Sequence, residues 1–371
     1  MIIPYNLNKR PIFFNTPAIK GMLPFQASLL LDPSDISLPI DPLHTVPVRE
    51  RPKIELADIF KQYGEEYLRT HTLSPDQHKV MYDITHCRSK QLGYHLDVCD
   101  HHCGHKEIAF NSCRNRHCPK CQNRARSKWV QARLAQLLPI AYYHTVFTLP
   151  HKIFPLSLYN KEIFYELLFN SAAETLQDFA ADPKHLGAKI GFYGILHTWG
   201  GALCQHLHVH FIVTGGGLNK EGQWVEPKYK DKFLFPVRAL SKTFRGKFIE
   251  GLKKAYYDGK LTLPYGFGNL AEIDKFEQWI DRLVAKEWVV YCKPPFSGPE
   301  EVVRYIGRYT HRVAISNHRL LSLDHGKVYF LYKDYKDKKE YWRQTHLDAP
   351  EFIRRFMMHV LPSRFHPVFY V

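Results

Sequence analysis

The sequence of 371 residues has no apolar run that approaches the roughly 18 residues needed to cross a membrane. Its first residues, Met1-Ile2-Ile3-Pro4-Tyr5-Asn6, lack the pattern of a secretory signal peptide. It also lacks internal repeats, low-complexity segments and the Gly-x4-Gly-Lys-Ser/Thr loop that a fused helicase would carry. These absences exclude a membrane-spanning protein and predict a cytoplasmic one without membrane partners.

Acidic residues are scarce relative to basic ones. The chain has 36 Asp and Glu against 51 Lys and Arg, which gives a formal net charge of +15. A basic surplus of this size usually indicates a polyanionic partner, most often nucleic acid. The alternative is a generic basic protein with a solvated surface.

Helical and strand patterns follow one another without a repeated βαβ unit, which favours an α+β fold on an antiparallel sheet. Residues 1–53 are rich in proline and are expected to form an extended arm. The expected helices are 54–71, 75–85, 123–138, 161–181, 244–257 and 273–288, and the expected strands are 142–149, 190–199 and 207–213.

Six of the eight cysteines lie within 35 residues, from Cys87 to Cys121. In a chain without a secretory signal, such clustering favours metal thiolates over disulfides. The spacings Cys99-x3-Cys103 and Cys118-x2-Cys121 match a zinc ribbon or knuckle, so these four cysteines are predicted to bind a structural Zn²⁺ ion. Other residues that could replace one of the four are Cys113, His102, His105 and His117. Cys87 could be buried or bind a second ion.

Arginines surround the cysteine cluster. Arg114 and Arg116 lie between its cysteines, and Arg124 lies in the basic helix that follows. A loop that a metal ion holds rigid is a good surface for phosphates, so these three side chains are predicted to contact DNA. The alternative is a solvated charged face.

The strand at 207–213 alternates between histidine and apolar residues. His208 and His210 share one face, because residues two apart on a strand point the same way. The opposite face is wholly apolar and should lie on the core; it consists of Leu207, Val209, Phe211 and Val213. Two parallel imidazoles form a metal platform, although satisfied core histidines are the commoner case.

A third nitrogen has two candidates. His197 lies eleven residues before His208, and a hairpin between the two strands would place it across from the pair. His206 is the rival, because it shares the face of His208 and His210 at the start of their strand. We prefer His197.

Tyr305 and Tyr309 lie four residues apart after a capping sequence, Ser297-Gly298-Pro299-Glu300, so a helix would present both hydroxyls on one face. The neighbouring stripe is basic and is predicted to bind DNA phosphates; it consists of Arg304, Arg308 and Arg312. Tyrosines at this spacing commonly serve packing. Beside arginines and a metal platform they are typical of nucleophiles that attack phosphorus.

A phenol, with a pKa of about 10, is a weak nucleophile at neutral pH. A divalent ion held by the histidines would polarise the scissile phosphate and stabilise the charge that develops on it. Attack by tyrosine would leave a 5′-phosphotyrosine and a free 3′-hydroxyl, which conserves the bond energy for rejoining. The expected ion is Mg²⁺ or Mn²⁺, and three imidazoles favour Mn²⁺ or another transition metal.

Three segments carry a resemblance to a known family. They are NSCRNRHCPKCQ at 111–122, HLHVH at 206–210 with GGGL at 215–218, and YIGRYTHR at 305–312. Together they resemble the two-tyrosine HUH rolling-circle transposases of bacterial insertion sequences, which carry an N-terminal zinc-binding domain. The resemblance covers about 54–362, and relatives are expected to continue with a further basic segment.

The resemblance implies an HUH endonuclease fold, an antiparallel sheet flanked by helices, preceded by a small helical zinc-binding domain. It implies action on single-stranded DNA at element ends, hairpins included. By the same resemblance His208 and His210 are the metal ligands, and Tyr305 and Tyr309 the nucleophiles, of which some relatives use only one. Related plasmid relaxases place a third histidine about eleven residues upstream, which supports His197.

The expected layout is an arm at 1–53, a helical zinc-binding domain at 54–138, a catalytic domain at 139–320 and a C-terminal segment at 321–371. We therefore expect a nucleoid-associated bacterial transposase that nicks and rejoins single DNA strands. One alternative is a plasmid relaxase or replication initiator with the same chemistry. Another is a non-catalytic, zinc-dependent DNA-binding protein, against which the intact motifs weigh.

Overall fold

The computed structural model describes residues 54–100, 103–134, 137–228, 234–264, 266–293, 296, 301–302, 305, 314–334, 341–363, 365 and 368–370. All of them belong to one compact unit, Glu50–Val371. The arm predicted for 1–53 lies outside the described residues. The domain boundaries predicted at 138 and 320 remain predictions.

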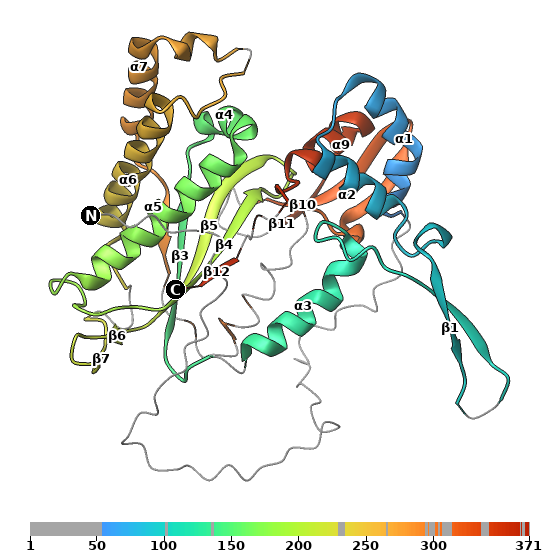
Figure 1. The fold of residues 1–371 in the computed structure, drawn as a ribbon, viewed down its shortest axis with the longest axis horizontal. Helices are drawn as coiled ribbons and strands as arrows, with labels where there is room; N and C mark the ends of the chain where they lie inside the picture. Colours follow the sequence, from blue (N-terminus) through green and yellow to red (C-terminus); the bar gives the residue numbers. More distant parts are fainter. Residues whose placement is uncertain are drawn as a thin grey trace. The chain divides into compact units, whose positions relative to one another are not determined.

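A five-stranded antiparallel sheet has the histidine strand at its centre (Figure 1). In spatial order its strands are β12 (Val368–Tyr370), β4 (Phe192–Trp199), β5 (Gln205–Thr214), β3 (Tyr142–Thr148) and β8 (Val290–Cys292). Each neighbouring pair is antiparallel. The strands predicted at 142–149 and 190–199 are therefore present with ends shifted by at most two residues.

The two faces of this sheet differ as the alternation of the sequence requires. One face carries the apolar side chains that were predicted to lie on the core. All four are fully buried: Leu207, Val209, Phe211 and Val213. Helices α5 (Lys161–Ala181) and α6 (Val237–Tyr257) share their core, to which they contribute Phe164, Phe244 and Phe248. Replacing one such phenylalanine with alanine would lower the free energy of unfolding by about 3–5 kcal/mol. The other face carries the histidines.

Smaller elements complete this part of the chain. They are α4 (Phe154–Tyr159), α7 (Ile273–Val284) and the two-residue strands β6 (Gly217–Leu218) and β7 (Trp224–Val225). Helix α6 begins seven residues before the predicted start, because Pro236 is its N-cap and buried Leu240 extends the apolar stripe. Helix α7 ends four residues before the predicted end, because Trp288 turns into the core and its Nε1 donates to the carbonyl of Leu283 (3.0 Å).

Two helices open the described chain, α1 (Leu56–Thr70) and α2 (Pro75–Thr85). The predicted cap of α2 is present. Oγ of Ser74 accepts from the backbone N–H of Gln77 (3.3 Å), and the side chain of Gln77 accepts from the N–H of Ser74 (2.9 Å). Pro75 occupies the first turn, where its missing N–H costs nothing.

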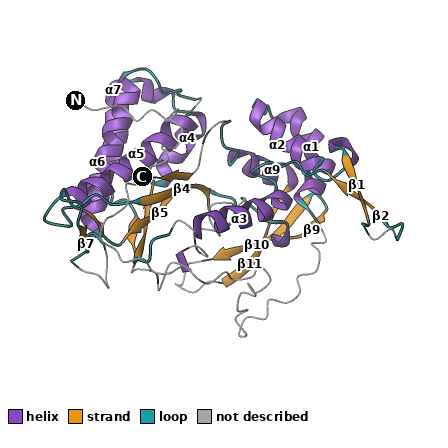
Figure 2. Cartoon of the chain, turned by 60° about the horizontal axis from the view of Figure 1, so that its bottom comes forward, coloured by secondary structure: helices purple, strands orange, loops and turns teal. Residues whose placement is uncertain are grey.

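The C-terminal part forms a second sheet that the sequence analysis did not predict. Its strands are β9 (Leu320–Asp324), β10 (Lys327–Asp334) and β11 (Tyr341–Asp348), in the order β11-β10-β9, followed by α9 (Ala349–Met358). Val328 and Phe330 of β10 are fully buried in a core that α1, α2 and α9 share. Figure 2 shows these three helices beside β9 and β10. The helices α1 and α2 therefore share one core with β9, β10 and α9, which come more than 230 residues later in the chain.

Between α2 and the main sheet lie a hairpin of β1 (Tyr94–Val98) and β2 (Lys106–Phe110) and the basic helix α3 (Pro119–Leu134). Helix α3 begins four residues before the predicted start, directly at the second cysteine pair. The structure thus combines helices with antiparallel sheets, as predicted. Among the described residues, no helix has the length and apolar character required to cross a membrane.

Candidate active site and metal centres

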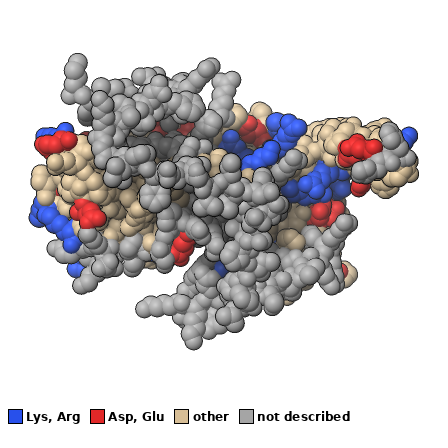
Figure 3. All heavy atoms as spheres, turned by 90° about the horizontal axis from the view of Figure 1, so that it is seen from below, with Lys and Arg blue, Asp and Glu red and all other residues tan. Residues whose placement is uncertain are grey.

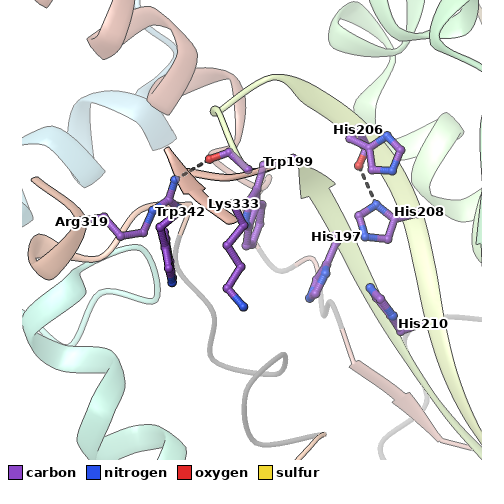
Figure 4. A pocket seen from close by; sticks show the side chains of 10 residues that line it. His197, Trp199, His206, His208, His210, Arg319, Lys333 and Trp342 are labelled. Carbon is purple, nitrogen blue, oxygen red and sulfur yellow. Dashed lines mark hydrogen bonds between the residues drawn. The ribbon is translucent and has the colours of Figure 1, made fainter. Parts of the chain in front are cut away.

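Three histidines gather on the face of the main sheet opposite the core that α5 and α6 share (Figure 4). His208 and His210 extend from β5, and His197 lies directly across from His208 on β4. One ring nitrogen from each lies within 4.8 Å of the others. His197 and His210 are buried, and His208 is half-buried. The predicted pair and the preferred third histidine are therefore together.

His206 has a different place. It is not part of this group, and its carbonyl oxygen lies 2.8 Å from Nδ1 of His208 (Figure 4). A carbonyl oxygen can only accept, so Nδ1 of His208 carries the proton and donates it. The lone pair of a neutral His208 is then on Nε2, which suits it as a metal ligand.

A fourth histidine, His144 on β3, connects this group to a tyrosine. Its Nε2 is 2.8 Å from Nδ1 of His210, with the two rings nearly parallel (6°). The hydroxyl oxygen of Tyr305 lies 3.0 Å from the same Nε2 and 3.2 Å from Nδ1. Burial, with a smaller effect from the charge of Lys293, lowers the pKa of His144 to about 3, so the ring is neutral at pH 7. Because His144 engages Nδ1 of His210, the buried Nε2 is the nitrogen of this ring that could face a metal ion.

Tyr305 rests on an apolar patch beside the histidines. The patch consists of Tyr142, Ile195, Ile212 and Val302, with Phe296 at its edge. Residues 301, 302 and 305, the described part of the predicted tyrosine helix, are helical. Tyr309, Arg304, Arg308 and Arg312 lie outside the described residues, so their predicted roles stay predictions.

Four cysteines form a second group, in which the sulfur atoms lie within 4.8 Å of one another: Cys87, Cys113, Cys118 and Cys121. Sγ of Cys121 is 3.5 Å from that of Cys87 and 3.6 Å from that of Cys113. The N–H of Cys121 donates to the carbonyl of Cys118 (3.1 Å), which closes a tight turn at the start of α3. Four converging sulfur donors are the ligand set of a structural zinc ion.

Two of the four cysteines that the spacing predicted as zinc ligands, Cys118 and Cys121, belong to this group, and its other two members are Cys87 and Cys113. Cys99 and Cys103 are outside it, because they follow β1 at the far end of the hairpin. The ladder from Tyr94↔Phe110 to Val98↔Lys106 extends that end away from α3. At the hairpin base the N–H of Arg88 donates to the carbonyl of Asn111 (3.1 Å), which brings the neighbouring Cys87 and Cys113 together.

The histidines that the sequence offered as substitutes for a cysteine ligand make other contacts where the structure describes them. The carbonyl of His105 accepts from the N–H of Cys99 (3.1 Å). Nε2 of His117 accepts from the N–H of Leu361 (3.4 Å), so this ring contacts the C-terminal segment and not the sulfur atoms. His102 lies outside the described residues.

Comparison with known proteins identifies the family. The chain matches the family model described as "Putative transposase" over residues 191–371 and the one described as "Transposase zinc-binding domain" over residues 59–149. It is 50% identical over 318 residues to "Putative transposase y4qJ" of Sinorhizobium fredii, which covers 85% of this chain and 79% of that protein. The chain belongs to this transposase family.

A second relative is named "Transposase for insertion sequence element IS801" and comes from Pseudomonas savastanoi pv. phaseolicola. The transposase is 29% identical to it over 290 residues, which cover 76% of this chain and 67% of the relative. No solved structure matches the chain. The family inferred from the three sequence segments is confirmed, and the zinc-binding match together with the four-cysteine group supports a structural zinc.

The arginines predicted to bind DNA differ in their surroundings. Arg114 is exposed, at a backbone position with φ of 53°. Nη1 of Arg116 donates to the carbonyl of Phe365 (2.7 Å), so Arg116 joins the cysteine loop to the C-terminal segment of the transposase. Arg124 lies in α3, but its side chain is not described. Figure 3 shows Lys and Arg side chains gathered right of centre on the face seen from below.

Sequence reasoning missed His144, although a signal was present. In the predicted strand at 142–149, the large apolar residues Tyr143 and Phe147 share one face, which is fully buried in the core, and His144 lies on the other. His144 therefore had to share a face with the histidines if β3 and β5 were neighbours. The structure shows that β3 and β5 are neighbours, because His144 pairs with Ile212, two residues from His210.

Proposed function

We propose that this transposase nicks and rejoins single-stranded DNA at insertion-sequence ends, on an HUH-type fold and through a covalent 5′-phosphotyrosine. The observation that carries the proposal is the position of the Tyr305 hydroxyl. It lies 3.0 Å from His144, which is itself hydrogen-bonded to one member of a three-histidine group. The side chain of His144 thus connects the candidate nucleophile, Tyr305, to the candidate metal site formed by the three histidines.

The donor set fits a divalent transition metal. His197, His208 and His210 would hold it, and three imidazoles suit Mn²⁺ better than Mg²⁺, which prefers oxygen ligands. When bound there, the ion would polarise the phosphate and lower the energy of the developing charge. In the second group, Cys87, Cys113, Cys118 and Cys121 would hold the structural zinc.

The chain's own residues would carry the transfer. The phenolic oxygen of Tyr305 attacks phosphorus, the bond from phosphorus to the 3′ oxygen breaks, and the 5′ phosphate becomes attached to tyrosine. The phenolic proton passes to solvent water, and the departing 3′ oxygen takes up a proton from water to become a hydroxyl. Rejoining is the reverse, with a 3′-hydroxyl as the attacking group. His144 fixes the phenol oxygen by hydrogen bonding, and Tyr309 is the second proposed nucleophile.

The proposed function is tested by trapping and mapping the adduct. Wild-type protein would be incubated with single-stranded oligonucleotides that carry candidate element ends, with Mn²⁺ or Mg²⁺, and resolved on denaturing gels. Trypsin cleaves after Arg304, Arg308 and Arg312, so the two tyrosines fall in separate peptides, 305–308 and 309–312. Mass spectrometry should find a nucleotide on one or both. Absence of any metal-dependent adduct, while DNA binding persists, would refute the proposal.

His144 should matter for metal affinity as well as for the nucleophile. Replacing it with phenylalanine keeps a flat ring beside His210 but removes the bond to Nδ1, so Mn²⁺ affinity should fall roughly 10- to 100-fold. His144→Gln should restore part of it, because the glutamine amide can reach a similar position. Mn²⁺ binding would be measured by electron paramagnetic resonance of the free ion.

The control for this experiment is Ile212→Val, a change on the same sheet face that costs stability of about 0.5–1.5 kcal/mol without removing a ring nitrogen. It should leave Mn²⁺ affinity unchanged. If His144→Phe binds Mn²⁺ as tightly as the wild type, the proposed positioning role is wrong.

A further inference from the structure

The second sheet, β9–β10–β11, has one covered and one open face. Val328 and Phe330 are fully buried toward α1 and α9. The alternate residues of β10, among them Tyr329 and Lys333, point the other way and are not buried, since successive strand residues face opposite sides. This open face lies in the same compact unit as the histidines.

Aromatic and basic side chains gather on the open face in two cross-strand pairs. Lys333 pairs with Trp342, and its Nζ lies 5.5 Å from the centre of the indole ring. Tyr329 pairs with His346, with ring centres 5.2 Å apart. The two pairs are four residues apart along β10, roughly 13 Å. We call these four residues the aromatic face.

One end of the aromatic face forms a wall of the histidine pocket. The pocket has a volume of about 360 Å³ and is lined by Lys333 and Trp342 as well as by His197, His208 and His210 (Figure 4). Trp342 is 55% exposed, which is unusual for a side chain of its size. Trp199 lines the same pocket and stacks on His197, with ring centres 5.3 Å apart.

The other cation that lines the pocket has a structural role. Arg319 donates from Nε to the carbonyl of Leu331 (2.7 Å) and from Nη2 to the carbonyl of Gly201. It therefore joins the β4–β5 turn to β10 and holds the wall in place. Lys333, by contrast, has its charge over an aromatic ring, where it can meet a phosphate next to a stacked base.

We infer that the aromatic face binds the unpaired DNA strand beside the phosphate that is cleaved, with a base stacked on Trp342 and the adjoining phosphate near Lys333. Exposed aromatic rings interleaved with cations are how single strands are held without sequence preference. A duplex would hide the faces of its bases from Trp342. The inference rests on the proposed function, because it takes the histidine pocket as the place of cleavage, and it names the surface that leads the strand there.

Binding of a short fluorescent oligo(dT) to the full chain, in buffer without added divalent metal, tests this directly. Trp342→Ala should weaken binding about tenfold or more, and Trp342→Phe should recover most of the loss. Lys333→Ala should reduce the slope of log affinity against log salt by roughly 0.7. Matched controls are Trp224→Ala, 39% exposed, and Lys220→Ala, both on the β6–β7 hairpin; neither should change binding.

The outcomes separate this inference from the proposed function. If Trp342→Ala binds oligo(dT) like the wild type, the aromatic face is not the strand-binding surface, whether or not the wild type forms adducts. The inference also fails if a duplex competitor binds as tightly and depends equally on Trp342. If Trp342→Ala weakens binding but the wild type forms no adduct, the strand-binding surface stands and the tyrosyl chemistry falls.

Discussion

Replacing Tyr305 with phenylalanine should reduce the rate of covalent adduct formation by roughly three orders of magnitude or more. The change removes one oxygen atom, the one that lies 3.0 Å from His144. The ring can keep its contacts with Phe296 and the rest of the apolar patch, so folding and metal binding should be preserved. Single-turnover adduct formation with excess protein measures the effect free of product release.

The matched control is Tyr142→Phe, which removes a hydroxyl from the same apolar patch. That hydroxyl accepts from the N–H of Leu138 (3.0 Å) and has no place in the proposed transfer. Its loss should lower stability by about 1 kcal/mol and leave the adduct rate close to that of the wild type. If Tyr305→Phe reacts at the wild-type rate, with the nucleotide on the peptide 309–312, then Tyr305 is not the nucleophile of this step.

Replacing Cys118 with serine should release the structural zinc and destabilise the part of the protein formed by α1, α2, α9 and the second sheet. Cys118 is buried in their shared core as well as in the sulfur group. Structural zinc contributes roughly 10–16 kcal/mol of apparent binding energy, so losing one of four ligands should cost at least about 3 kcal/mol. Zinc content after dialysis and thermal unfolding together measure the effect.

Cys103→Ser distinguishes the two possible ligand sets. The spacing of the sequence makes Cys103 a zinc ligand, whereas the structure places it outside the four-sulfur group. Cys103→Ser should therefore retain the zinc that Cys118→Ser loses and should unfold at the wild-type temperature. If the two variants lose the same zinc and the same stability, the ligand set is the one that the spacing predicts.

Features that depend on local periodicity were accessible from the sequence. The alternation around His208 and His210 fixes which face meets the core, whatever lies beyond the strand. Ser74 and Gln77 form their capping box within a single turn. The placement of His197 required one further step, the hairpin between β4 and β5, which is the simplest connection of two consecutive strands.

Features that depend on distant pairings were not accessible. The β1–β2 hairpin, a ladder of five residue pairs, holds Cys99 at its far end, away from Cys118 and Cys121. The sulfur of Cys87, at the base of the hairpin, lies beside that of Cys121 instead. The sequence did not predict the second sheet, because Tyr329 and Leu331 are largely apolar, like their buried neighbours Val328 and Phe330. Strand β10 therefore lacks a regular alternation of apolar and polar residues. Its core partners also lie in α1, more than 250 residues earlier in the chain.

The contacts between α1, α2 and the C-terminal segment determine when this protein can finish folding. The N–H of Leu56 donates to Asn317, the side chain of Gln77 to the carbonyl of Met357, and the N–H of Ser363 to Asp76, across 261, 280 and 287 residues. A ribosome that adds 5–20 residues per second needs roughly 15 to 60 seconds to cover that distance.

Throughout this interval the apolar faces of α1 and α2 lack the cover of α9. The four cysteines, however, have all been synthesised once Cys121 has emerged. Zinc captured by the nascent chain would hold the end of α2 against the start of α3 until synthesis is complete. Zinc shortage would then act first on how much protein survives chaperones and proteases, before any effect on the function of the folded protein.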